Sequence, residues 1–278
     1  MEVLRYTAFS HQPAGGNPAG VVLDAAGLDD ATMLAVAAEV GYSETAFLVE
    51  QGAGRFAVRY FSPLAEVPFC GHATIASAVA YAERHGRGAM LLATRAGEVA
   101  VETSTDPAGL TTATLTSVPP KVAPLEPADV DRLLDALRWR PDELDPGLPL
   151  RVAYAGAWHP VVAVRDRSRL ADLDYDFDAL GRQMAERDWT TVALVWRAGP
   201  DRFDVRNPFP PGGVVEDPAT GAAAAALGGY LRELGLVEVP ATLTLHQGDD
   251  MGRPSLLTVT VPAAPGSGIG VSGTAVAL

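Results

Sequence analysis

Glu44 is the first side chain that could carry proton-transfer chemistry, because of its position in the segment "GYSETAF". A glycine that ends a helical pattern precedes it, and an apolar strand pattern follows it. A carboxylate that enters a buried strand loses hydration, which raises its pKa toward the range useful for acid–base catalysis. The alternative is a solvated loop glutamate, or one that accepts hydrogen bonds from nearby backbone N–H groups.

Cys70 and His72 lie in a second candidate segment, "PFCGHATIAS", where a glycine turn opens a helix. The positive end of the helix dipole disfavours a charged imidazole, so we expect His72 to be neutral. The same dipole would stabilise a thiolate at Cys70. The structural alternatives are a capping histidine and a buried, inert cysteine, which is the commoner role of a lone cysteine.

Two matching segments, "CGHAT" and "EDPATGA", each stand before a helix of small residues. The first turn of a helix presents unpaired N–H groups and a partial positive charge, and small side chains let a ligand approach the backbone. Two such helix starts could together bind a carboxylate. Alternatively, the polar residues here only cap the helices and the glycine only makes a turn. The candidate substrate-binding residues here are Gly71, Ala73, Thr74, Thr220, Gly221 and Ala222, whereas Asp217 is a candidate catalytic residue.

Asn17 and the segment "LHQGDDMGRPS" are further candidates. Asn17 either binds a ligand from its glycine-rich loop or sets a turn before Pro18. The second segment is expected to be a hairpin that lines a cleft through Gly248 and Arg253, or else an exposed turn. No segment resembles a P-loop, a dinucleotide-binding fingerprint, a Ser–His–Asp arrangement or a metal-ligand cluster, so the sequence predicts neither metal nor cofactor.

The elements that must position these residues occur twice along the chain. In the first half, helices are predicted at 30–40 and 73–85, among strand patterns such as "AGVVLD", "TAFLVE" and "FAVRYFSP". The same order returns about 145 residues later in "HPVVAV", "TTVALVWRA", "FDVRNPFP" and "TGAAAAALGGYLRELG", a period too long for a solenoid. Helices are predicted there at 129–139, 178–187 and 221–234. The sequence therefore indicates a duplicated domain.

The proline-rich segment "TSVPPKVAPLEPADV" separates the two halves. We predict an N-terminal domain at 1–118, a C-terminal domain at 125–268, and a terminal strand at 270–278 that could pair with either. Two related domains commonly meet at a cleft where small ligands bind. A residue needed for folding should recur in both halves, whereas a residue needed for chemistry need appear only once. Glu44 appears once, because the matching "WTTVAL" has no carboxylate.

Composition narrows the classes of function. The 278 residues carry a formal net charge of −13, which argues against nucleic acid and anionic membranes but leaves room for a small anionic substrate at a locally positive site. The single cysteine excludes an internal disulfide and cysteine-based structural zinc sites. The start lacks a signal-peptide pattern and "GAAAAALGGYL" is too short to span a bilayer, so we expect a soluble cytoplasmic protein.

Taken together, the segments "GNPAGVV", "SETAF", "VPFCGHATIASA", "EDPATGAAA" and "QGDDMGRPS" resemble the PhzF-like family, named for phenazine biosynthesis, in order and over nearly the whole chain. The resemblance implies an α+β fold of the diaminopimelate epimerase type, with two similar domains that each wrap a curved, mostly antiparallel sheet around a central helix. It implies a cofactor-independent isomerase and a homodimer. Glu44 matches the family's acid–base glutamate, and His72 and Asp217 match its polar partners in the cleft.

Two departures from related enzymes bear on the substrate and the mechanism. The phenazine enzyme of the family has a serine where this chain has Ala222, which removes a hydroxyl from the pocket and weakens the case for the same substrate. The related epimerases use one cysteine at each helix start, and Cys70 matches only the first, so a two-thiol racemase is excluded.

The main hypothesis is an isomerase that moves a proton between carbons of a small carboxylate-bearing substrate, with Glu44 as acid and base. A one-base racemase or epimerase that uses Glu44 with His72 or Asp217 is one alternative. A non-catalytic small-molecule binder that kept the cleft is another.

Overall fold

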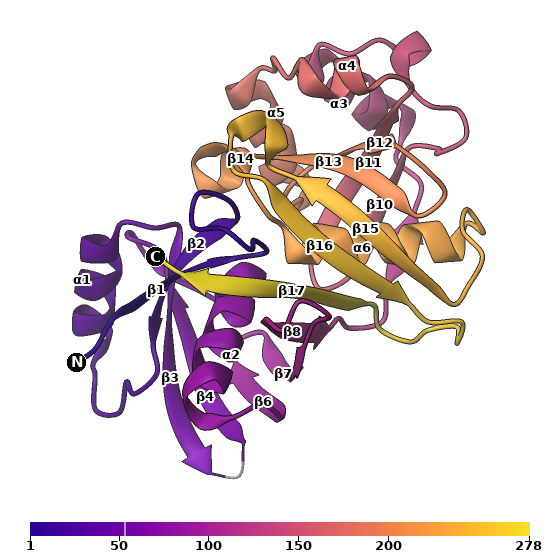
Figure 1. The fold of residues 1–278 in the computed structure, drawn as a ribbon. Helices are drawn as coiled ribbons and strands as arrows, with labels where there is room; N and C mark the ends of the chain where they lie inside the picture. Colours follow the sequence, from indigo (N-terminus) through magenta and orange to yellow (C-terminus); the bar gives the residue numbers. More distant parts are fainter. Residues whose placement is uncertain (53) are drawn as a thin grey trace. The chain divides into compact units, whose positions relative to one another are not determined.

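The computed structural model describes residues 1–52 and 54–278, and these fold as two compact units (Figure 1). The first unit comprises Met1–Thr116 together with Ser272–Leu278, and the second comprises Ser117–Val271. Among the described residues, no helix is long and apolar enough to cross a membrane.

The first unit is a sheet that closes into a ring. Strands β17, β1, β2, β3, β4, β6, β7 and β8 pair in that order, and β8 pairs again with β17. The pairs β2–β3 and β4–β6 are parallel, so a helix must cross over between the partners of each pair. The strands are β1 (Leu4–Ala8), β2 (Asn17–Val22), β3 (Glu44–Gly52), β4 (Arg55–Phe61), β5 (Glu66–Val67), β6 (Ala89–Thr94), β7 (Gly97–Thr105), β8 (Thr111–Thr116) and β17 (Gly270–Ala277).

Helix α2 (Gly71–His85) is the crossover between β4 and β6, and it lies at the centre of the ring (Figure 1). It contacts β1, β2, β3, β7 and β8, and every residue from His72 to Ala80 is buried. A helix that is enclosed on all sides needs small side chains, which explains the run "ATIASAVA". The other crossover, α1 (Asp30–Val40), begins at the capping side chain of Asp29 and ends at Gly41, whose φ is 72°.

The second unit repeats this plan. Its main strands pair in the order β10, β11, β12, β13, β15, β16. The pairs β11–β12 and β13–β15 are parallel and the others antiparallel, the same alternation as in β1, β2, β3, β4, β6, β7. The strands are β9 (Lys121–Ala123), β10 (Arg151–Tyr154), β11 (Trp158–Val164), β12 (Ala193–Arg197), β13 (Arg202–Phe209), β14 (Val214–Asp217), β15 (Ala241–Gln247) and β16 (Ser255–Val261).

Helix α6 (Gly221–Glu233) takes the place of α2 in this unit and contacts β9, β10, β11 and β16. The second unit also carries an outer layer of helices, in which Leu133, Leu137, Leu180 and Met184 form part of a buried cluster against the sheet. These helices and the short 3-10 turns are α3 (Pro127–Leu137), α4 (Arg167–Ala171), α5 (Phe177–Arg187), η1 (Pro141–Glu143), η2 (Pro210–Gly212) and η3 (Asp249–Met251).

The predicted helices are confirmed, with shifts of one or two residues at their ends. The helix predicted at 73–85 begins two residues earlier, at Gly71. The helix predicted at 129–139 begins at Pro127 and ends at Leu137, because proline suits the first position of a helix and Arg138 adopts a left-handed φ of 56°. The segment around Gly248 is a hairpin turn between β15 and β16, as predicted. The terminal strand, left open by the sequence, completes the ring of the first unit.

Candidate active site

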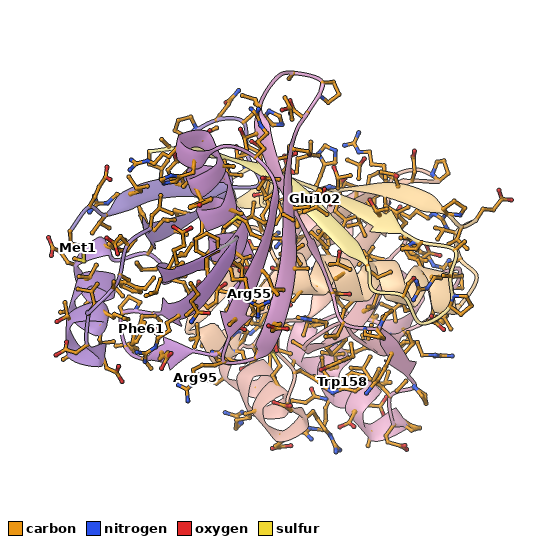
Figure 2. All side chains as sticks on the ribbon, turned by 90° about the horizontal axis from the view of Figure 1, so that it is seen from below. Met1, Arg55, Phe61, Arg95, Glu102 and Trp158 are labelled. Carbon is orange, nitrogen blue, oxygen red and sulfur yellow. The ribbon has the colours of Figure 1, made fainter. Side chains whose placement is uncertain are left out.

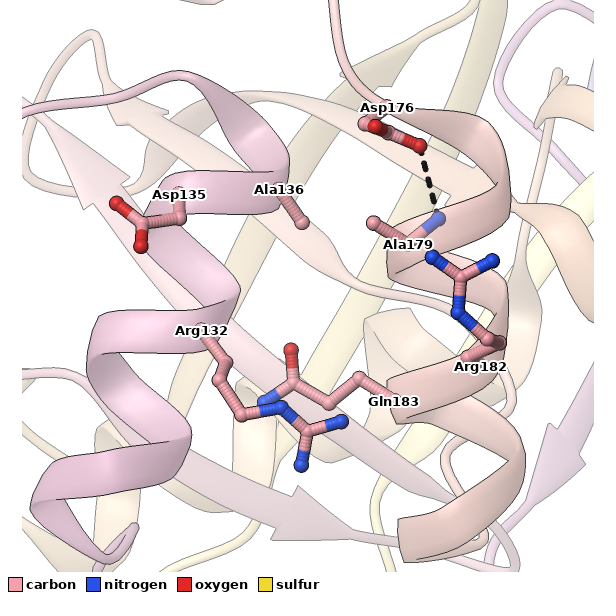
Figure 3. Close-up of a pocket in the computed structure, with 7 residues that line it drawn as sticks. All are labelled: Arg132, Asp135, Ala136, Asp176, Ala179, Arg182 and Gln183. Atoms are coloured by element: carbon pink, nitrogen blue, oxygen red, sulfur yellow. Dashed lines mark hydrogen bonds between the residues drawn. The ribbon is translucent and has the colours of Figure 1, made fainter.

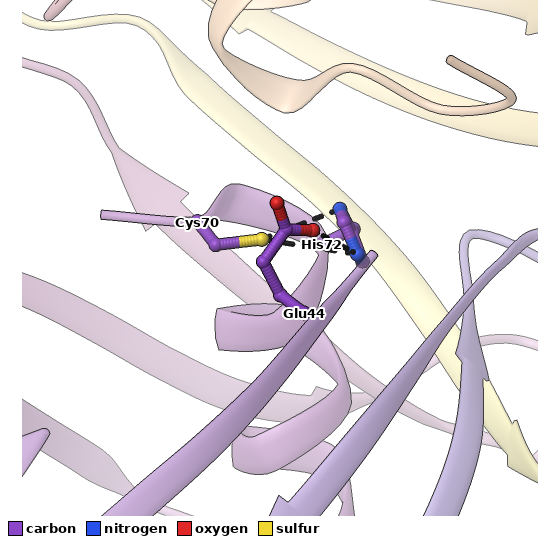
Figure 4. Close-up of side chains that lie close together, drawn as sticks. All are labelled: Glu44, Cys70 and His72. Carbon is purple, nitrogen blue, oxygen red and sulfur yellow. Dashed lines mark hydrogen bonds and ion pairs between the residues drawn. The ribbon is translucent and has the colours of Figure 1, made fainter. Parts of the chain in front are cut away.

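Glu44, Cys70 and His72 come together at one end of α2 in the first unit (Figure 4). Glu44 is the first residue of β3, Cys70 precedes α2, and His72 lies in the first turn of α2. Nε2 of His72 is 3.3 Å from Oε2 of Glu44, and its Nδ1 is 3.4 Å from Sγ of Cys70. The three side chains that the sequence singled out for proton chemistry therefore form one cluster, in which a polar atom of each lies within 4.8 Å of the others.

Asn17 and Ser43 complete the surroundings of the His72 ring. Nδ2 of Asn17 lies 3.1 Å from Nδ1 of His72. An amide nitrogen can only donate, so Nδ1 accepts and the ring proton resides on Nε2. Nε2 faces the Glu44 carboxylate and also lies 3.4 Å from Oγ of Ser43.

The loop before Asn17 is shaped by Gly16. Its φ is 69°, and a Cβ there would lie 2.4 Å from the Ala8 carbonyl oxygen and 2.5 Å from Oγ1 of Thr7. Thr7 also donates a hydrogen bond of 2.6 Å to the Gly15 carbonyl. Only glycine combines this backbone conformation with such a close approach. The loop therefore delivers Asn17 to the start of β2 in a fixed position, with 2% of its surface exposed.

The start of α2 holds the remaining candidates of the first unit. The Thr74 N–H and hydroxyl both donate to the Cys70 carbonyl, at 3.0 and 2.7 Å, and the hydroxyl also shares a hydrogen bond with Tyr60. Thr74 thus builds the helix start. The N–H groups of Gly71 and Ala73 precede the first helical hydrogen bond. Gly71 is half-buried and Ala73 is fully buried, so Gly71 is the more accessible of the two.

Asp217, Thr220 and Gln247 form a separate polar group at the start of α6, within the second unit. The Thr220 hydroxyl donates to Oδ2 of Asp217 at 2.6 Å. The Gln247 amide accepts from the Thr220 N–H at 3.0 Å and donates to the Asp217 carbonyl at 2.7 Å. Gly221 is buried and Ala222 is half-buried in the first turn of α6. The carboxylate of Asp217 is therefore held in place by a network of hydrogen bonds.

Gly248 and Arg253 lie in the turn between β15 and β16, directly after Gln247. Gly248 has a φ of 78°, and a Cβ there would lie 2.3 Å from the Arg253 carbonyl oxygen and 2.8 Å from the Pro218 carbonyl oxygen. The glycine thus allows the turn to pack against the segment that leads into α6. The Arg253 N–H donates to the Gly248 carbonyl at 2.9 Å, and its side chain is half-buried.

The sequence interpretation missed Ser43 and Gln247. Ser43 stood next to Glu44 in "SETAF", and Gln247 stood directly before Gly248, but neither residue type has a diagnostic spacing. A buried glutamine at the end of a strand, before a turn glycine, is the one signal that could have been used. Gln247 has 1% of its surface exposed, and a buried amide needs partners.

The second unit has different polar residues at the positions that match Asn17 and Glu44 in the repeat. In the sequence repeat, His159 matches Asn17 and Thr191 matches Glu44. The strand pairing keeps the match of Thr191 with Glu44 but places His159 at the level of Ala19. Nδ1 of His159 lies 2.9 Å from the Thr191 hydroxyl, which donates to Oδ1 of Asn207 at 3.0 Å. Complete burial lowers the pKa of His159 to about 4. The hydrogen-bonded group of His159, Thr191 and Asn207 is therefore neutral and buried, and it contains no carboxylate.

Two surface hollows lie away from these groups. One, of about 320 Å³, opens between α3 and α5 (Figure 3). Its Arg132 is paired with Glu186 at 2.8 Å. The other, of about 440 Å³, lies on the outer face of the first unit. Its Arg95, labelled in Figure 2, is paired with Glu66 at 2.7 Å. Arg132 in the first hollow and Arg59 and Arg95 in the second are paired with neighbouring carboxylates, and no candidate catalytic residue lines either hollow.

The comparisons with known proteins identify the family of this chain. The family model of phenazine biosynthesis-like proteins matches residues 6–278. The chain belongs to this family. It is 32% identical over 289 residues to the uncharacterized isomerase YddE of Escherichia coli strain K12, with 100% of this chain and 96% of that protein covered. It is 31% identical over 253 residues to trans-2,3-dihydro-3-hydroxyanthranilate isomerase of Pseudomonas chlororaphis, with 90% and 86% covered.

Solved structures agree on the fold. The phenazine biosynthesis protein of the PhzF family from Bacillus anthracis has a TM-score of 0.88 at 24% identity, over 100% of this chain and 98% of that one. A probable proline racemase from Agrobacterium radiobacter has a TM-score of 0.68 at 14% identity, over 99% and 90%. The PhzF-type chain therefore has the α+β, diaminopimelate epimerase-like fold that the resemblance implied, and it is an enzyme of the isomerase class.

Proposed function

We propose that this PhzF-family isomerase moves a proton between two carbons of a small carboxylate-bearing substrate, and that Glu44 carries the proton. The ionised carboxylate removes a proton from a carbon made acidic by neighbouring unsaturation. The electron pair left behind shifts through the conjugated system. The same carboxyl group then returns the proton to a second carbon, so that the double bond moves and the atoms balance without an outside reagent.

The compactness of the Glu44 cluster carries this proposal. Two groups that invert a carbon must approach it from opposite faces, each at about 3–3.5 Å from the reacting atom, which places them about 6–7 Å apart. A polar atom of Glu44, Cys70 and His72 lies within 4.8 Å of the others. These groups can therefore serve one face of a substrate. That geometry favours removal and return of a proton on the same face, by one base, over inversion between two of these groups.

His72 supports the base in this scheme and does not replace it. Asn17 donates to Nδ1, so Nε2 carries a proton toward Glu44. A neutral N–H donor at 3.3 Å stabilises the carboxylate before it takes up the proton, and it also orients the oxygen that reacts. Because His72 has 6% of its surface exposed, water does not readily compete for this contact.

We assign substrate binding to the two helix starts. At α2, the half-buried Gly71 N–H and the helix dipole offer a site for a carboxylate. Asp217, held by Thr220 at the start of α6, is proposed as a second polar group that the reaction requires. The Pseudomonas relative acts on trans-2,3-dihydro-3-hydroxyanthranilate, an unsaturated carboxylate of the required kind. Since Ala222 has no hydroxyl, the substrate of this chain is proposed to share that chemistry and differ in its polar substituents.

Product analysis in deuterated water tests the reaction type. The purified protein is incubated with trans-2,3-dihydro-3-hydroxyanthranilate and then with other small unsaturated carboxylates, and the products are followed by nuclear magnetic resonance. We expect a shifted double bond, with hydrogen gained at a carbon other than the one that lost it. Deuterium that enters with inversion at a single carbon, without a shifted double bond, would instead identify an epimerase and overturn the proposal.

A further inference from the structure

Glu44, Cys70 and His72 each offer a metal-ligand atom within 4.8 Å of the other two (Figure 4), and the two separations that involve the His72 ring are close to those of a tetrahedral metal site. Zinc binds sulfur at about 2.3 Å, imidazole nitrogen at about 2.0–2.1 Å and carboxylate oxygen at about 2.0–2.2 Å. A tetrahedron with these bonds separates nitrogen from oxygen by about 3.4 Å and nitrogen from sulfur by about 3.6 Å. Nε2 of His72 lies 3.3 Å from Oε2 of Glu44 and 3.8 Å from Sγ of Cys70.

The charges and the burial of the same three groups also suit a divalent cation. A thiolate and a carboxylate together neutralise two positive charges, and the imidazole binds as a neutral ligand. Cys70 and His72 have 7% and 6% of their surfaces exposed, so the ion would bind where water screens it little. A thiolate ligand selects soft or borderline ions such as Zn²⁺, Co²⁺ and Cd²⁺ over Mg²⁺ and Ca²⁺.

We propose that Glu44, Cys70 and His72 form a binding site for a zinc-like divalent cation, and that the bound ion inhibits the enzyme. Three protein ligands leave the fourth tetrahedral position for water or another small ligand. A Glu44 oxygen that coordinates the ion cannot accept a proton from carbon, so metal binding and the proposed proton transfer exclude each other. This site could not be predicted from the sequence, because its ligands come from two segments and share no metal-binding spacing.

Asn17 is the positioning residue for this site. Coordination through Nε2 moves the ring proton to Nδ1, which then needs an acceptor. The amide nitrogen of Asn17 now faces Nδ1 at 3.1 Å, and rotation of the amide would present its oxygen instead. An aspartate at this position would accept that proton without rotation, and a leucine would offer no acceptor. The two substitutions should therefore change metal affinity in opposite directions.

Cobalt binding to the full-length, chelator-treated protein tests the proposal without any substrate. We expect one equivalent of Co²⁺ to bind with sulfur-to-cobalt charge-transfer absorption in the near ultraviolet, and Zn²⁺ to displace it. Cys70→Ser should abolish the absorption, and His72→Gln and Glu44→Gln should each weaken binding at least about tenfold. His85→Gln and Glu39→Gln, which replace exposed residues of the same types, are the matched controls and should bind as the unmodified protein does.

Thiol labelling gives a second measurement that does not depend on the cysteine variant folding. Cys70 is the only cysteine, so modification by a small thiol reagent reports on it alone. Zn²⁺ should slow the modification, and this protection should be lost in His72→Gln. Asn17→Asp should lower the zinc concentration needed for protection, and Asn17→Leu should raise it. Absence of the cobalt band, its persistence in Cys70→Ser, or labelling that Zn²⁺ does not change would each overturn the proposal.

The metal proposal and the proposed function fail separately. If no ion binds but Glu44→Gln stops turnover in metal-free buffer, only the metal site is wrong. If the ion binds as described but Glu44→Gln turns over normally in metal-free buffer, the role assigned to Glu44 in catalysis is wrong and the metal site stands.

Discussion

The two units share a framework but carry different polar groups at matching positions in it. Both have the same alternation of parallel and antiparallel strand pairs around a helix of small residues. At matching points of the repeat, the first unit places Asn17 and Glu44 beside His72, whereas the second places a buried hydrogen-bonded chain from His159 through Thr191.

This difference separates folding from chemistry. In the first unit, this position of the shared fold holds a carboxylate, that of Glu44, whose side chain keeps 15% of its surface exposed. In the second unit, the matching position holds a neutral hydroxyl, that of Thr191, and 1% of the surface of this residue is exposed. A group that only completes the fold is buried and hydrogen-bonded within the protein, as Thr191 is in the second unit. A group that must exchange protons with a ligand keeps access to it. The predictions below set corresponding residues of the two units against each other.

The largest effect is expected at Glu44. Glu44→Gln keeps the shape and the hydrogen-bonding capacity of the side chain but removes the base, so turnover should fall by about 10²–10⁴-fold. Glu50→Gln, at an exposed position of the same strand β3, is the control and should leave turnover unchanged. Steady-state rates of both variants, with circular dichroism to verify folding, decide the matter. Normal turnover of a folded Glu44→Gln protein would exclude Glu44 as the base.

A smaller loss is expected from Asp217→Asn in the second unit. The amide can still accept from the Thr220 hydroxyl, so the fold should persist, while the negative charge at the start of α6 is lost. We expect turnover to fall by about 10–100-fold. Asp201→Asn, an exposed residue of the same unit, is the control. If Asp217→Asn is as active as this control, Asp217 serves the fold of the second unit alone.

The buried histidine of the second unit should affect stability and its dependence on pH. The unfolded chain binds a proton at His159 below about pH 6.5, whereas the folded chain does so only near pH 4. The unfolded state therefore gains protons first, and stability is lost as pH falls through this window, by about 1.4 kcal/mol per unit. Between pH 7 and pH 5, the protein should lose about 2 kcal/mol more than His159→Gln does.

Urea unfolding at the two pH values measures this difference. His85→Gln, which replaces an exposed histidine, should keep the pH dependence of the unmodified protein. Equal pH dependence in the unmodified protein and in His159→Gln would show that His159 accepts a proton in the folded state.

The smallest effect is expected at Thr191, the counterpart of Glu44. Thr191→Val keeps the shape but removes the hydroxyl that links His159 to Asn207. Loss of this buried hydrogen bond should cost about 1–3 kcal/mol of stability and leave turnover unchanged. A thermal melt and a rate measurement on the same sample test both points. A turnover loss like that of Glu44→Gln would contradict the separation between the two units.

Much of the fold was readable from local sequence signals. Asp29 and Gly41 bound α1 because an N-cap and a left-handed C-cap act within a few residues of the helix. The repeat was visible because both halves must bury a helix of small residues inside a sheet. Helix α3 ends two residues before the predicted end, at Leu137. The residue that ends it in a left-handed conformation is Arg138, and arginine does not mark a helix end in the sequence as glycine does.

The candidate site was less readable, because its contacts join distant segments. Glu44, His72 and Asp217 were identified from sequence, mainly through the family resemblance, and their catalytic roles stay predictions. The contact of Cys70 with His72 could not be deduced from the turn "FCGH", since it depends on the rotation of both side chains. Ser43 and Gln247 act through tertiary contacts, which no spacing along the chain encodes.

The most direct test of the account is the ratio of turnover rates between Thr191→Val and Glu44→Gln, assayed side by side on the same substrate in metal-free buffer. Both variants replace corresponding residues of the two units with side chains of similar shape. We predict that Thr191→Val turns over at least about 100 times faster than Glu44→Gln. A ratio near one, in two folded proteins, would contradict the claim that the proton chemistry resides at Glu44 in the first unit.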